Sequence, residues 1–365
     1  MFRGKQKKAR IAVTGLGTGS IAAIPGMVQH LRNGGRSEAR RRAALTALEL
    51  PERKGAVVTD VPVRSVMRRP KLKAHVPIMY GCDKFCTFCI VPMTRGRERS
   101  RPTTEILREI EGLARGGTKE ITLLGQTVNS YGKNLAEGRV PFARLLEMIG
   151  EIRGIRRVRF TSPYPRDFTD DLIDAIARLP QVCEHVHLPV QVGDDELLTR
   201  MHRGYTIGQY LEIVRKLRAA VPGIAITTDL MLGFPGETDE QFQNTMRFAE
   251  ETRFDAAFMF AYSVRPGTKA ADMPDQVPHS VKVDRLNQLI ALQNAIAAEI
   301  NASQVGQVFE VLVEGRSPRD FAKLTGLTRT FKTVCFPGEP RLIGKLVQVR
   351  TTEAGMTGFL GEVVE

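Results

Sequence analysis

The sequence predicts an α/β protein: a partial (β/α)6 barrel, followed by a small all-β barrel and preceded by an incomplete α/β segment. From about residue 76, short apolar runs alternate with helical patterns, which is typical of a parallel sheet with right-handed crossovers. Six such units favour an open or partial barrel over the closed eight-stranded form. After about residue 303 the pattern changes to short β-type runs with Gly and Pro turns, which indicates a second, all-β unit.

Six segments carry the strand pattern of the partial barrel. They are residues 76–80, 120–125, 157–162, 185–190, 224–234 and 256–264. A long helical pattern at about 278–303 closes this unit. Because ligands of parallel α/β sheets bind at the C-terminal ends of the strands, we expect the functional side chains where these segments end.

The two ends of the chain differ in how clearly they predict structure. The runs VFEVLVEG, KTVCFPG, LIGKLVQVRTTEAG and TGFLGEVVE predict a small antiparallel barrel, and such barrels commonly bind oligonucleotides. Before residue 76, IAVTG at 11–15 predicts a strand, which a Gly-rich turn and an arginine-rich helix follow. We therefore expect three parts, at residues 1–70, 71–302 and 303–365, of which the first is not a complete domain.

The chain is basic, and its charge is unevenly distributed. The formal net charge is +13, and residues 1–75 alone carry 17 basic and 4 acidic side chains. Such a stretch attracts a polyanion such as RNA through counterion release, although a charge-rich end is as often a solvated segment. No apolar run reaches the length of a membrane span, and the first residues are too basic and polar for a signal peptide. We expect a cytoplasmic protein with no membrane partner.

The strongest chemical signal is GCDKFCTFC, which places Cys82, Cys86 and Cys89 in a C-x3-C-x2-C run after the first strand segment. Three thiolates on one tight loop can hold an iron–sulfur cluster. A structural zinc site needs a fourth Cys or His close by, and none follows within the next 90 residues. Three ligands leave one iron of a four-iron cluster open for a cofactor or substrate. We expect the isolated Cys183 and Cys335 to be packing residues.

The chain resembles the radical S-adenosylmethionine (radical SAM) superfamily and, within it, the methylthiotransferases. The superfamily signature is C-x3-C-x2-C with an aromatic residue before the last cysteine, here Phe88. Further runs stand in the family's order: GCDKFCTFCIVPMTRGRERSRP, LLGQTVNSYG, HLPVQ, MHRGYT, TTDLMLGFPGETDEQF and FMFAYSVRPGTKAADM. The run from Phe254 to Met273 resembles the tRNA-2-methylthio-N6-dimethylallyladenosine synthase branch. The part from about residue 303 resembles the family's RNA-binding TRAM domain.

This resemblance implies a transferase that adds a methylthio group to C2 of N6-isopentenyladenosine next to the tRNA anticodon. In the family, one 4Fe-4S cluster, here on Cys82, Cys86 and Cys89, chelates S-adenosyl-L-methionine through its open iron. Electron transfer from the cluster cleaves this cofactor to a 5′-deoxyadenosyl radical, which abstracts hydrogen. The implied partners are tRNA and an electron donor protein of the flavodoxin or ferredoxin type, and we expect a monomer.

Together with Phe88, five residues at or near the strand ends are candidates for binding this cofactor. They are Gly125, Gln126, Ser162, Gln191 and Asp229. Asp229 is an acidic group inside an apolar run, and a buried carboxylate is costly unless it is paired, so a site role is favoured. For Gly125 and Gln126 a plain strand–helix turn stays open as an alternative. His187 is left out of the site, because a core histidine explains its alternation with apolar neighbours.

Four arginines follow the cysteine loop, namely Arg95, Arg97, Arg99 and Arg101. Arginine is a common phosphate ligand in nucleic-acid complexes, so we expect these side chains to contact an RNA substrate. The alternative is that half of them pair with local carboxylates such as Glu98.

The chain departs from the family at its beginning. Family members carry an N-terminal domain with three more cysteines, which hold a second 4Fe-4S cluster that serves in sulfur transfer, whereas this chain has no cysteine before Cys82. We therefore interpret residues 1–70 as a remnant of that methylthiotransferase domain and expect an N-terminally truncated sequence. Residues 71–302 are then the expected radical SAM core, and residues 303–365 the expected TRAM domain.

Two hypotheses from different classes follow. The first is a radical enzyme that cleaves S-adenosylmethionine but inserts sulfur poorly or not at all. The second is a non-catalytic tRNA-binding remnant, which the retained cysteine trio disfavours. A ribosomal-protein methylthiotransferase is a less favoured third reading, because the run after Phe254 is of the tRNA type.

Overall fold

The computed structural model describes residues 71–136 and 138–364. Our interpretation of residues 1–70 as a domain remnant therefore lies outside the described residues. The partial barrel contains the parallel strands β1 (Lys73–Pro77), β4 (Glu120–Leu124), β5 (Arg157–Phe160), β6 (His185–His187), β7 (Ala225–Leu232) and β8 (Ala256–Ala261). Each corresponds to one of the six predicted strand segments.

These strands form one curved layer in chain order. β1, β4 and β5 make one parallel sheet, and β6, β7 and β8 make another. The two sheets join at β5, where Val158 forms a parallel bridge with Val182. The Val158 N–H donates to Gln181 O at 2.7 Å, and the Cys183 N–H donates to Val158 O at 3.0 Å. The predicted partial (β/α)6 barrel is thereby confirmed.

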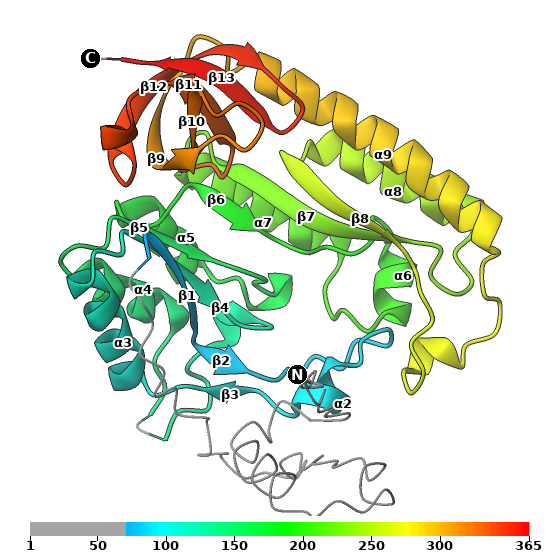
Figure 1. The fold of residues 1–365 in the computed structure, drawn as a ribbon. Coiled ribbons are helices and arrows are strands. Elements are labelled where there is room, and N and C mark those ends of the chain that lie inside the picture. The colour runs from blue at the N-terminus through cyan, green and yellow to red at the C-terminus, as the bar shows by residue number, and fades with distance from the viewer. Residues whose placement is uncertain (1–70, 137, 365) are drawn as a thin grey trace, which may run out of the picture.

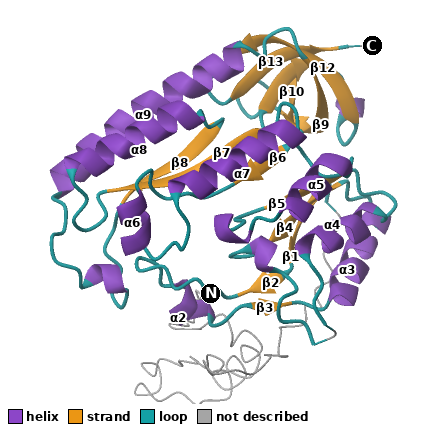
Figure 2. Ribbon diagram, turned by 180° about the vertical axis from the view of Figure 1, so that it is seen from behind, coloured by secondary structure: helices purple, strands orange, loops and turns teal. Residues whose placement is uncertain are grey.

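Helices cover the outer face of this barrel, with α7, α8 and α9 over β6–β8 and α3, α4 and α5 beside the other sheet (Figure 2). The helices are α2 (Val91–Arg95), α3 (Thr103–Arg115), α4 (Phe142–Gly150), α5 (Asp170–Arg178), α6 (Asp195–Arg200), α7 (Ile207–Ala220), α8 (Asp239–Thr252) and α9 (His279–Ala302). In α3 the buried residues Ile106, Ile110 and Leu113 recur at helical spacing, which directs one apolar stripe onto the sheet. A capping box of Thr206 and Gln209 begins α7 and satisfies backbone donors of its first turn.

A short antiparallel pair that the sequence did not predict frames the cysteine loop. It consists of β2 (Met79–Tyr80) and β3 (Arg99–Ser100), with Met79 opposite Ser100 and Tyr80 opposite Arg99. The predicted strand at 76–80 is therefore divided, because β1 stays on β4 only as far as Pro77. The pair brings the two ends of the segment between β2 and β3 together, so the cysteines lie on a closed loop.

The C-terminal part is a closed five-stranded barrel, which confirms the predicted all-β unit. Its strands are β9 (Val308–Arg316), β10 (Lys323–Thr328), β11 (Thr333–Pro337), β12 (Leu346–Ala354) and β13 (Gly358–Val363), in the order β10-β11-β13-β12-β9. Two details differ from the prediction. The sequence did not predict β10, and β11 pairs with β13 in parallel, so the barrel is not wholly antiparallel. Buried Val311, Leu324 and Phe336 belong to its own small core.

The small barrel is attached to the end of the strand layer that lies away from the cysteine loop (Figure 1). Arg157, at the start of β5, is fully buried. It donates to Leu327 O at 2.7 Å and to the Glu310 carboxylate at 2.9 Å. Arg159 donates to Thr328 O at 2.7 Å. These charge-assisted hydrogen bonds join the start of β5 to the C-terminal barrel. In the part of the chain that the structure describes, no helix is long and apolar enough to cross a membrane.

Candidate active site

The cysteine loop begins with a backbone turn that only glycine suits. Gly81 has φ +72°, and a Cβ atom there would lie 2.0 Å from Arg97 O. The next residue, Cys82, donates its N–H to Gly96 O at 3.2 Å. Glycine adopts positive φ without steric cost. The two backbone segments can therefore approach closely and hold the first cysteine at the loop's base.

The middle of the loop docks on segments distant in sequence. The Thr87 N–H donates to Met201 O at 3.1 Å, and the Thr87 hydroxyl donates to Arg200 O at 3.0 Å. The Thr87 carbonyl accepts from the Ala270 N–H at 2.9 Å. Because both backbone groups of Thr87 are bonded, the segment between Cys86 and Cys89 is fixed from two sides of the barrel.

The three thiols are shielded from water and share one environment. Cys86 is buried, while Cys82 and Cys89 are half-buried. Burial raises the pKa of the Cys82 thiol to about 12, and the Glu98 carboxylate and the two other thiols also raise it. Burial likewise raises the pKa of Cys89, with Cys86 also raising it. The thiols of Cys82 and Cys89 are therefore neutral until a cation is present to stabilise the thiolates.

The chemistry of this donor set fits an iron–sulfur cluster. Three soft sulfur ligands on one loop, with no histidine among them, are the ligand type of such clusters. Among residues 71–136 and 138–364, no three His, Cys, Asp or Glu side chains are close enough to hold a single metal ion. In a four-iron cluster each cysteine binds a different iron, so the sulfurs stand further apart than around one ion.

Arg203 is a site residue that the sequence analysis did not single out. Its guanidinium is buried and donates to the Cys86 sulfur at 3.4 Å and to Pro189 O at 3.0 Å. The rings of Tyr164 and Tyr205 lie at 5.0 Å and 5.4 Å from it. A buried cation needs such partners. Arg203 thus places one positive charge next to a cysteine sulfur. Its only signal in the sequence was its position in the run MHRGYT.

A second group of charges, also unpredicted, supports the start of the loop. Lys84 pairs with Asp167 at 2.6 Å and with Glu98 at 3.6 Å. Burial raises the pKa of Asp167, but hydrogen bonds from Lys133, Lys84 and Ser130 outweigh it and lower that pKa to about 2. Asp167 is therefore ionised at neutral pH and links the cysteine loop to the segment after β5.

Two of the predicted cofactor residues have unusual backbone conformations. Ser162 has φ 54° and Gln191 has φ 85°, a region that costs non-glycine residues free energy and that is concentrated at functional sites. The Gln191 N–H donates to Asp229 O at 2.9 Å, and the Met231 N–H donates to Gln191 O at 2.7 Å. Gln191 is thus bonded directly to the middle of β7, beside Asp229.

Asp229 has a partner, and that partner is the histidine left out of the predicted site. His187 Nε2 lies 3.3 Å from Asp229 Oδ1, and His187 Nδ1 lies 3.0 Å from Thr227 Oγ1. Both ring nitrogens therefore have a polar neighbour, so His187 is satisfied as expected of a core histidine. The pair also reduces the cost of burying the Asp229 carboxylate.

The remaining predicted cofactor residues lie near the loop. Gly125 and Gln126 directly follow β4, and a Cβ at Gly125 would lie 2.7 Å from Met79 Cγ. Close packing against β2 thus explains why residue 125 is a glycine. This agrees with the alternative that Gly125 and Gln126 form a plain strand–helix turn. Phe88 is half-buried and packs against the main core. A role of these three residues in cofactor binding stays a prediction.

The four arginines divide into two kinds. Arg95 is exposed. Arg97 donates from Nε to Asp83 Oδ1 at 2.6 Å, so it pairs with a local carboxylate. The phosphate-contact hypothesis therefore rests mainly on Arg95, because the Arg97 guanidinium already pairs with the Asp83 carboxylate.

The other two arginines are buried, and a phosphate contact of theirs stays a prediction. Arg99 and Arg101 are only 5% and 4% exposed. Arg101 donates to Pro77 O at 2.6 Å and pairs with Glu109 at 2.7 Å. Arg101 therefore joins the end of β3 to the end of β1 and to α3.

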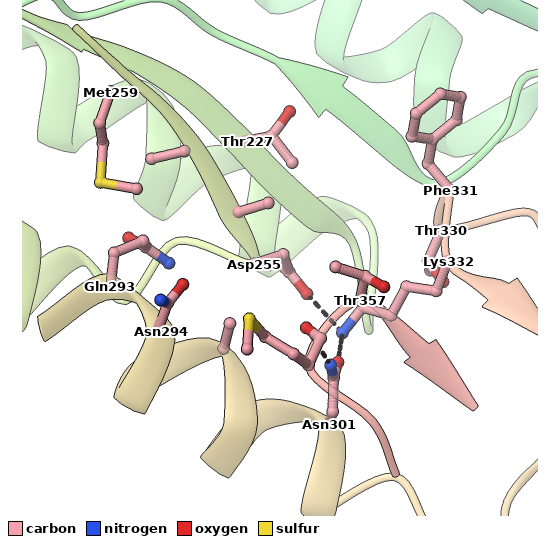
Figure 3. Close-up of a pocket in the computed structure, with 14 residues that line it drawn as sticks. Thr227, Asp255, Met259, Gln293, Asn294, Asn301, Thr330, Phe331, Lys332 and Thr357 are labelled. Carbon is pink, nitrogen blue, oxygen red and sulfur yellow. Dashed lines mark hydrogen bonds and ion pairs between the residues drawn. The ribbon is translucent and has the colours of Figure 1, made fainter. Parts of the chain in front are cut away.

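A cavity of about 230 Å³ lies elsewhere, between β8, α9 and the C-terminal barrel. Figure 3 shows Lys332 directed at Asp255 and Asn301, at 3.0 Å and 2.8 Å respectively. None of the predicted site residues lines this cavity. The polar contacts inside it connect the C-terminal barrel to the core.

Comparison with known proteins agrees with this architecture. Residues 76–249 match the radical SAM superfamily, and residues 302–364 match the TRAM domain. The fold and the cysteine loop therefore define a radical SAM enzyme with a C-terminal TRAM domain. This class of enzyme uses a 4Fe-4S cluster and S-adenosylmethionine.

Three relatives carry the same name, tRNA-2-methylthio-N(6)-dimethylallyladenosine synthase. The protein of Carboxydothermus hydrogenoformans is 50% identical over 317 residues, which cover 87% of this chain and 71% of the relative. That of Moorella thermoacetica is 47% identical over 96% of this chain and 76% of the relative. That of Thermoanaerobacter pseudethanolicus is 53% identical over 85% of this chain and 65% of the relative. The chain belongs to the tRNA-2-methylthio-N(6)-dimethylallyladenosine synthase family of transferases, and it spans between 65% and 76% of the length of these relatives.

Solved structures with similar folds are more distant in sequence. Coproporphyrinogen III oxidase from Escherichia coli, a radical SAM enzyme, is 19% identical, with a TM-score of 0.47 over 74% of this chain and 61% of that chain. The radical SAM methyltransferase TsrM from Kitasatospora setae is 20% identical, with a TM-score of 0.46 over 54% of this chain and 38% of that chain.

Proposed function

We propose that Cys82, Cys86 and Cys89 hold one 4Fe-4S cluster and that S-adenosylmethionine binds beside it at the C-terminal ends of the strands. The observation that carries this proposal is the shielded cysteine loop, with the buried Arg203 guanidinium 3.4 Å from the Cys86 sulfur. When bound, the cluster supplies the electron that cleaves S-adenosylmethionine to a 5′-deoxyadenosyl radical.

The protein's own groups have separate tasks in this proposal. The backbone of Gly125 and Gln126 follows β4 next to the loop, where it can meet the amino acid end of the cofactor. Ser162 and Gln191 are held in left-handed conformations, which aim their side chains before a ligand arrives. Asp229, paired with His187, can accept hydrogen bonds from cofactor hydroxyls.

The proposed reaction is methylthio transfer to C2 of N6-isopentenyladenosine next to the tRNA anticodon. The names of the relatives and the TRAM match support a tRNA substrate. The exposed Arg95 lies close in sequence to the cysteines and offers a phosphate contact. We further propose an electron donor of the flavodoxin or ferredoxin type, a monomeric protein and a cytoplasmic location.

Sulfur transfer is the step that we propose to be impaired in a polypeptide of this sequence. Its cysteines are the three of the loop, plus Cys183 and Cys335. Cys183 is buried in the core and Cys335 lies on β11 of the small barrel. The two cysteines are therefore in different units and cannot bind the same cluster. The 365 residues thus lack cysteines for the second 4Fe-4S cluster that the family resemblance implies.

Complementation tests this proposal. A strain that lacks its own methylthiotransferase is given this 365-residue chain, and its tRNA is analysed by mass spectrometry for 2-methylthio-N6-isopentenyladenosine. We expect the isopentenyl form to accumulate with little or no methylthio group. Full restoration of the methylthio group would refute impaired sulfur insertion. A separate binding assay compares purified tRNA with ribosomal protein, and binding to ribosomal protein instead of tRNA would favour a different substrate. The non-catalytic alternative predicts tRNA binding without any 5′-deoxyadenosine.

A further inference from the structure

One face of β7 and β8 is turned toward the inside of the barrel. On β7, Thr228, Leu230 and Leu232 are fully buried and alternate with Asp229 and Met231, which are less buried. Because side chains alternate across a strand, the first set faces the helices and the second faces the barrel interior.

The parallel register extends this inner face onto β8. Asp229 is opposite Phe258, and Met231 is opposite Phe260. Directly opposite residues share a face of a sheet. Phe258 and Phe260 therefore lie on the inner face, at the edge strand of the β6-β7-β8 sheet, which Figure 1 shows at the margin of the barrel.

Both phenyl rings are unusually accessible for an inner face. Phe258 is 59% exposed and Phe260 is 51% exposed. Single exposed apolar side chains are common, but here two rings stand at i and i+2 with the thioether of Met231 beside them. We call Met231, Phe258 and Phe260 the aromatic face. Leaving such a patch in water is unfavourable, which indicates a site for an apolar or planar ligand.

The aromatic face continues directly into the proposed cofactor site. The His187 ring meets Phe258 edge to face at 5.6 Å between centroids, and the same ring pairs with Asp229. Gln191 is hydrogen-bonded to the backbone of Asp229 and Met231. A ligand on the aromatic face therefore lies next to the residues that we assign to S-adenosylmethionine.

We propose that Phe258 and Phe260 determine substrate specificity in the proposed reaction: the aromatic face stacks on the target adenine and holds the branched five-carbon alkenyl group of its N6 atom. This inference rests on the proposed function. A planar base stacks on phenyl rings, and a five-carbon apolar group gains free energy by leaving water for phenyl and thioether surface. The Asp229 carboxylate at the edge can accept a hydrogen bond from the N6–H group of the base. An unmodified adenine offers this face no apolar group.

The test compares the binding of two RNA hairpins that differ only in the N6-dimethylallyl group of one adenosine. Fluorescence anisotropy with the full 365-residue chain gives the ratio of their Kd values. The test variant is Phe258→Ala with Phe260→Ala, and the control is Val283→Ala, a 38% exposed apolar side chain on α9 that belongs to none of the proposed sites. We expect the wild type to prefer the prenylated hairpin by about tenfold, the double variant to lose that preference, and the control to keep it.

Each outcome has one meaning. A preference that survives in the double variant, or that is missing in the wild type, overturns the proposal. If the alanine pair fails to fold, as read by circular dichroism, the Phe258→Gln, Phe260→Gln pair, which fills similar space without an apolar ring, takes its place, and an unchanged preference there also overturns it. Formation of 5′-deoxyadenosine by the wild type without RNA is measured separately. Its absence counts against the proposed function and not against the aromatic face.

Discussion

Replacing Gly81 by alanine tests how the cysteine loop is held. At φ +72° a residue with a Cβ is strained, at about 1–2 kcal/mol. The new Cβ would also lie 2.0 Å from Arg97 O, whereas ordinary contact begins at 3.4 Å. The backbone must therefore shift by about 1 Å, which breaks the hydrogen bond from the Cys82 N–H to Gly96 O, worth about 1 kcal/mol. The total is about 3 kcal/mol, located next to the first cysteine.

Gly117 provides a matched control, because it has φ +91° and, among the residues that the structure describes, a Cβ there would meet nothing within 4 Å. Gly117→Ala carries the backbone strain without the clash, so it should cost about 1–2 kcal/mol and leave iron loading unchanged. Urea unfolding followed by circular dichroism gives the free energies, and iron per polypeptide after anaerobic reconstitution gives the loading. We expect Gly81→Ala to bind less than half of the wild-type iron. Equal iron, with equal stability of the two variants, would refute the reasoning.

Three further predictions concern charged groups. Arg203→Met removes the donor to the Cys86 sulfur, so the electron paramagnetic resonance signal of the reduced cluster should shift, and an unchanged spectrum and potential would contradict that contact. Arg157→Ala breaks a buried ion pair and should lower the free energy of unfolding by about 3–5 kcal/mol, whereas its exposed neighbour Arg156→Ala should change it by less than about 0.5 kcal/mol. Asp167 has its pKa lowered to about 2 from 3.8, so it stabilises the protein above pH 4, and about 2 kcal/mol of that is lost as the pH falls toward 2. Asp167→Asn should remove this loss from unfolding curves measured between pH 5 and 2, and an unaltered pH dependence would show that the carboxylate is not stabilised as described.

The positions of the core strands could be predicted because each strand is a short apolar run between helical patterns. β10 was missed, since KLTGLT alternates weakly and contains a glycine that packs closely only in the closed barrel. A Cβ at Gly326 would lie 2.2 Å from Leu312 O, which is a tertiary contact without a local sequence signal.

The cysteine loop could be recognised from spacing, but its supporting residues could not. Arg99 and Arg101 looked like surface charges, because sequence alone does not reveal the carbonyls and the carboxylate that compensate their burial. Arg203 could not be recognised either, because its partners, the Cys86 sulfur and Pro189 O, are distant in sequence. His187 alternates like a core residue, and only the fold places it against Asp229.

The most direct test of the account is anaerobic reconstitution of the purified chain with iron and sulfide, followed by S-adenosylmethionine and a reductant. We expect about four irons per polypeptide and formation of 5′-deoxyadenosine, both of which are lost in Cys86→Ala and retained in Cys335→Ala. A chain that binds no cluster and forms no 5′-deoxyadenosine, or one in which Cys86→Ala behaves like the wild type, would contradict the assignment of the cysteine loop.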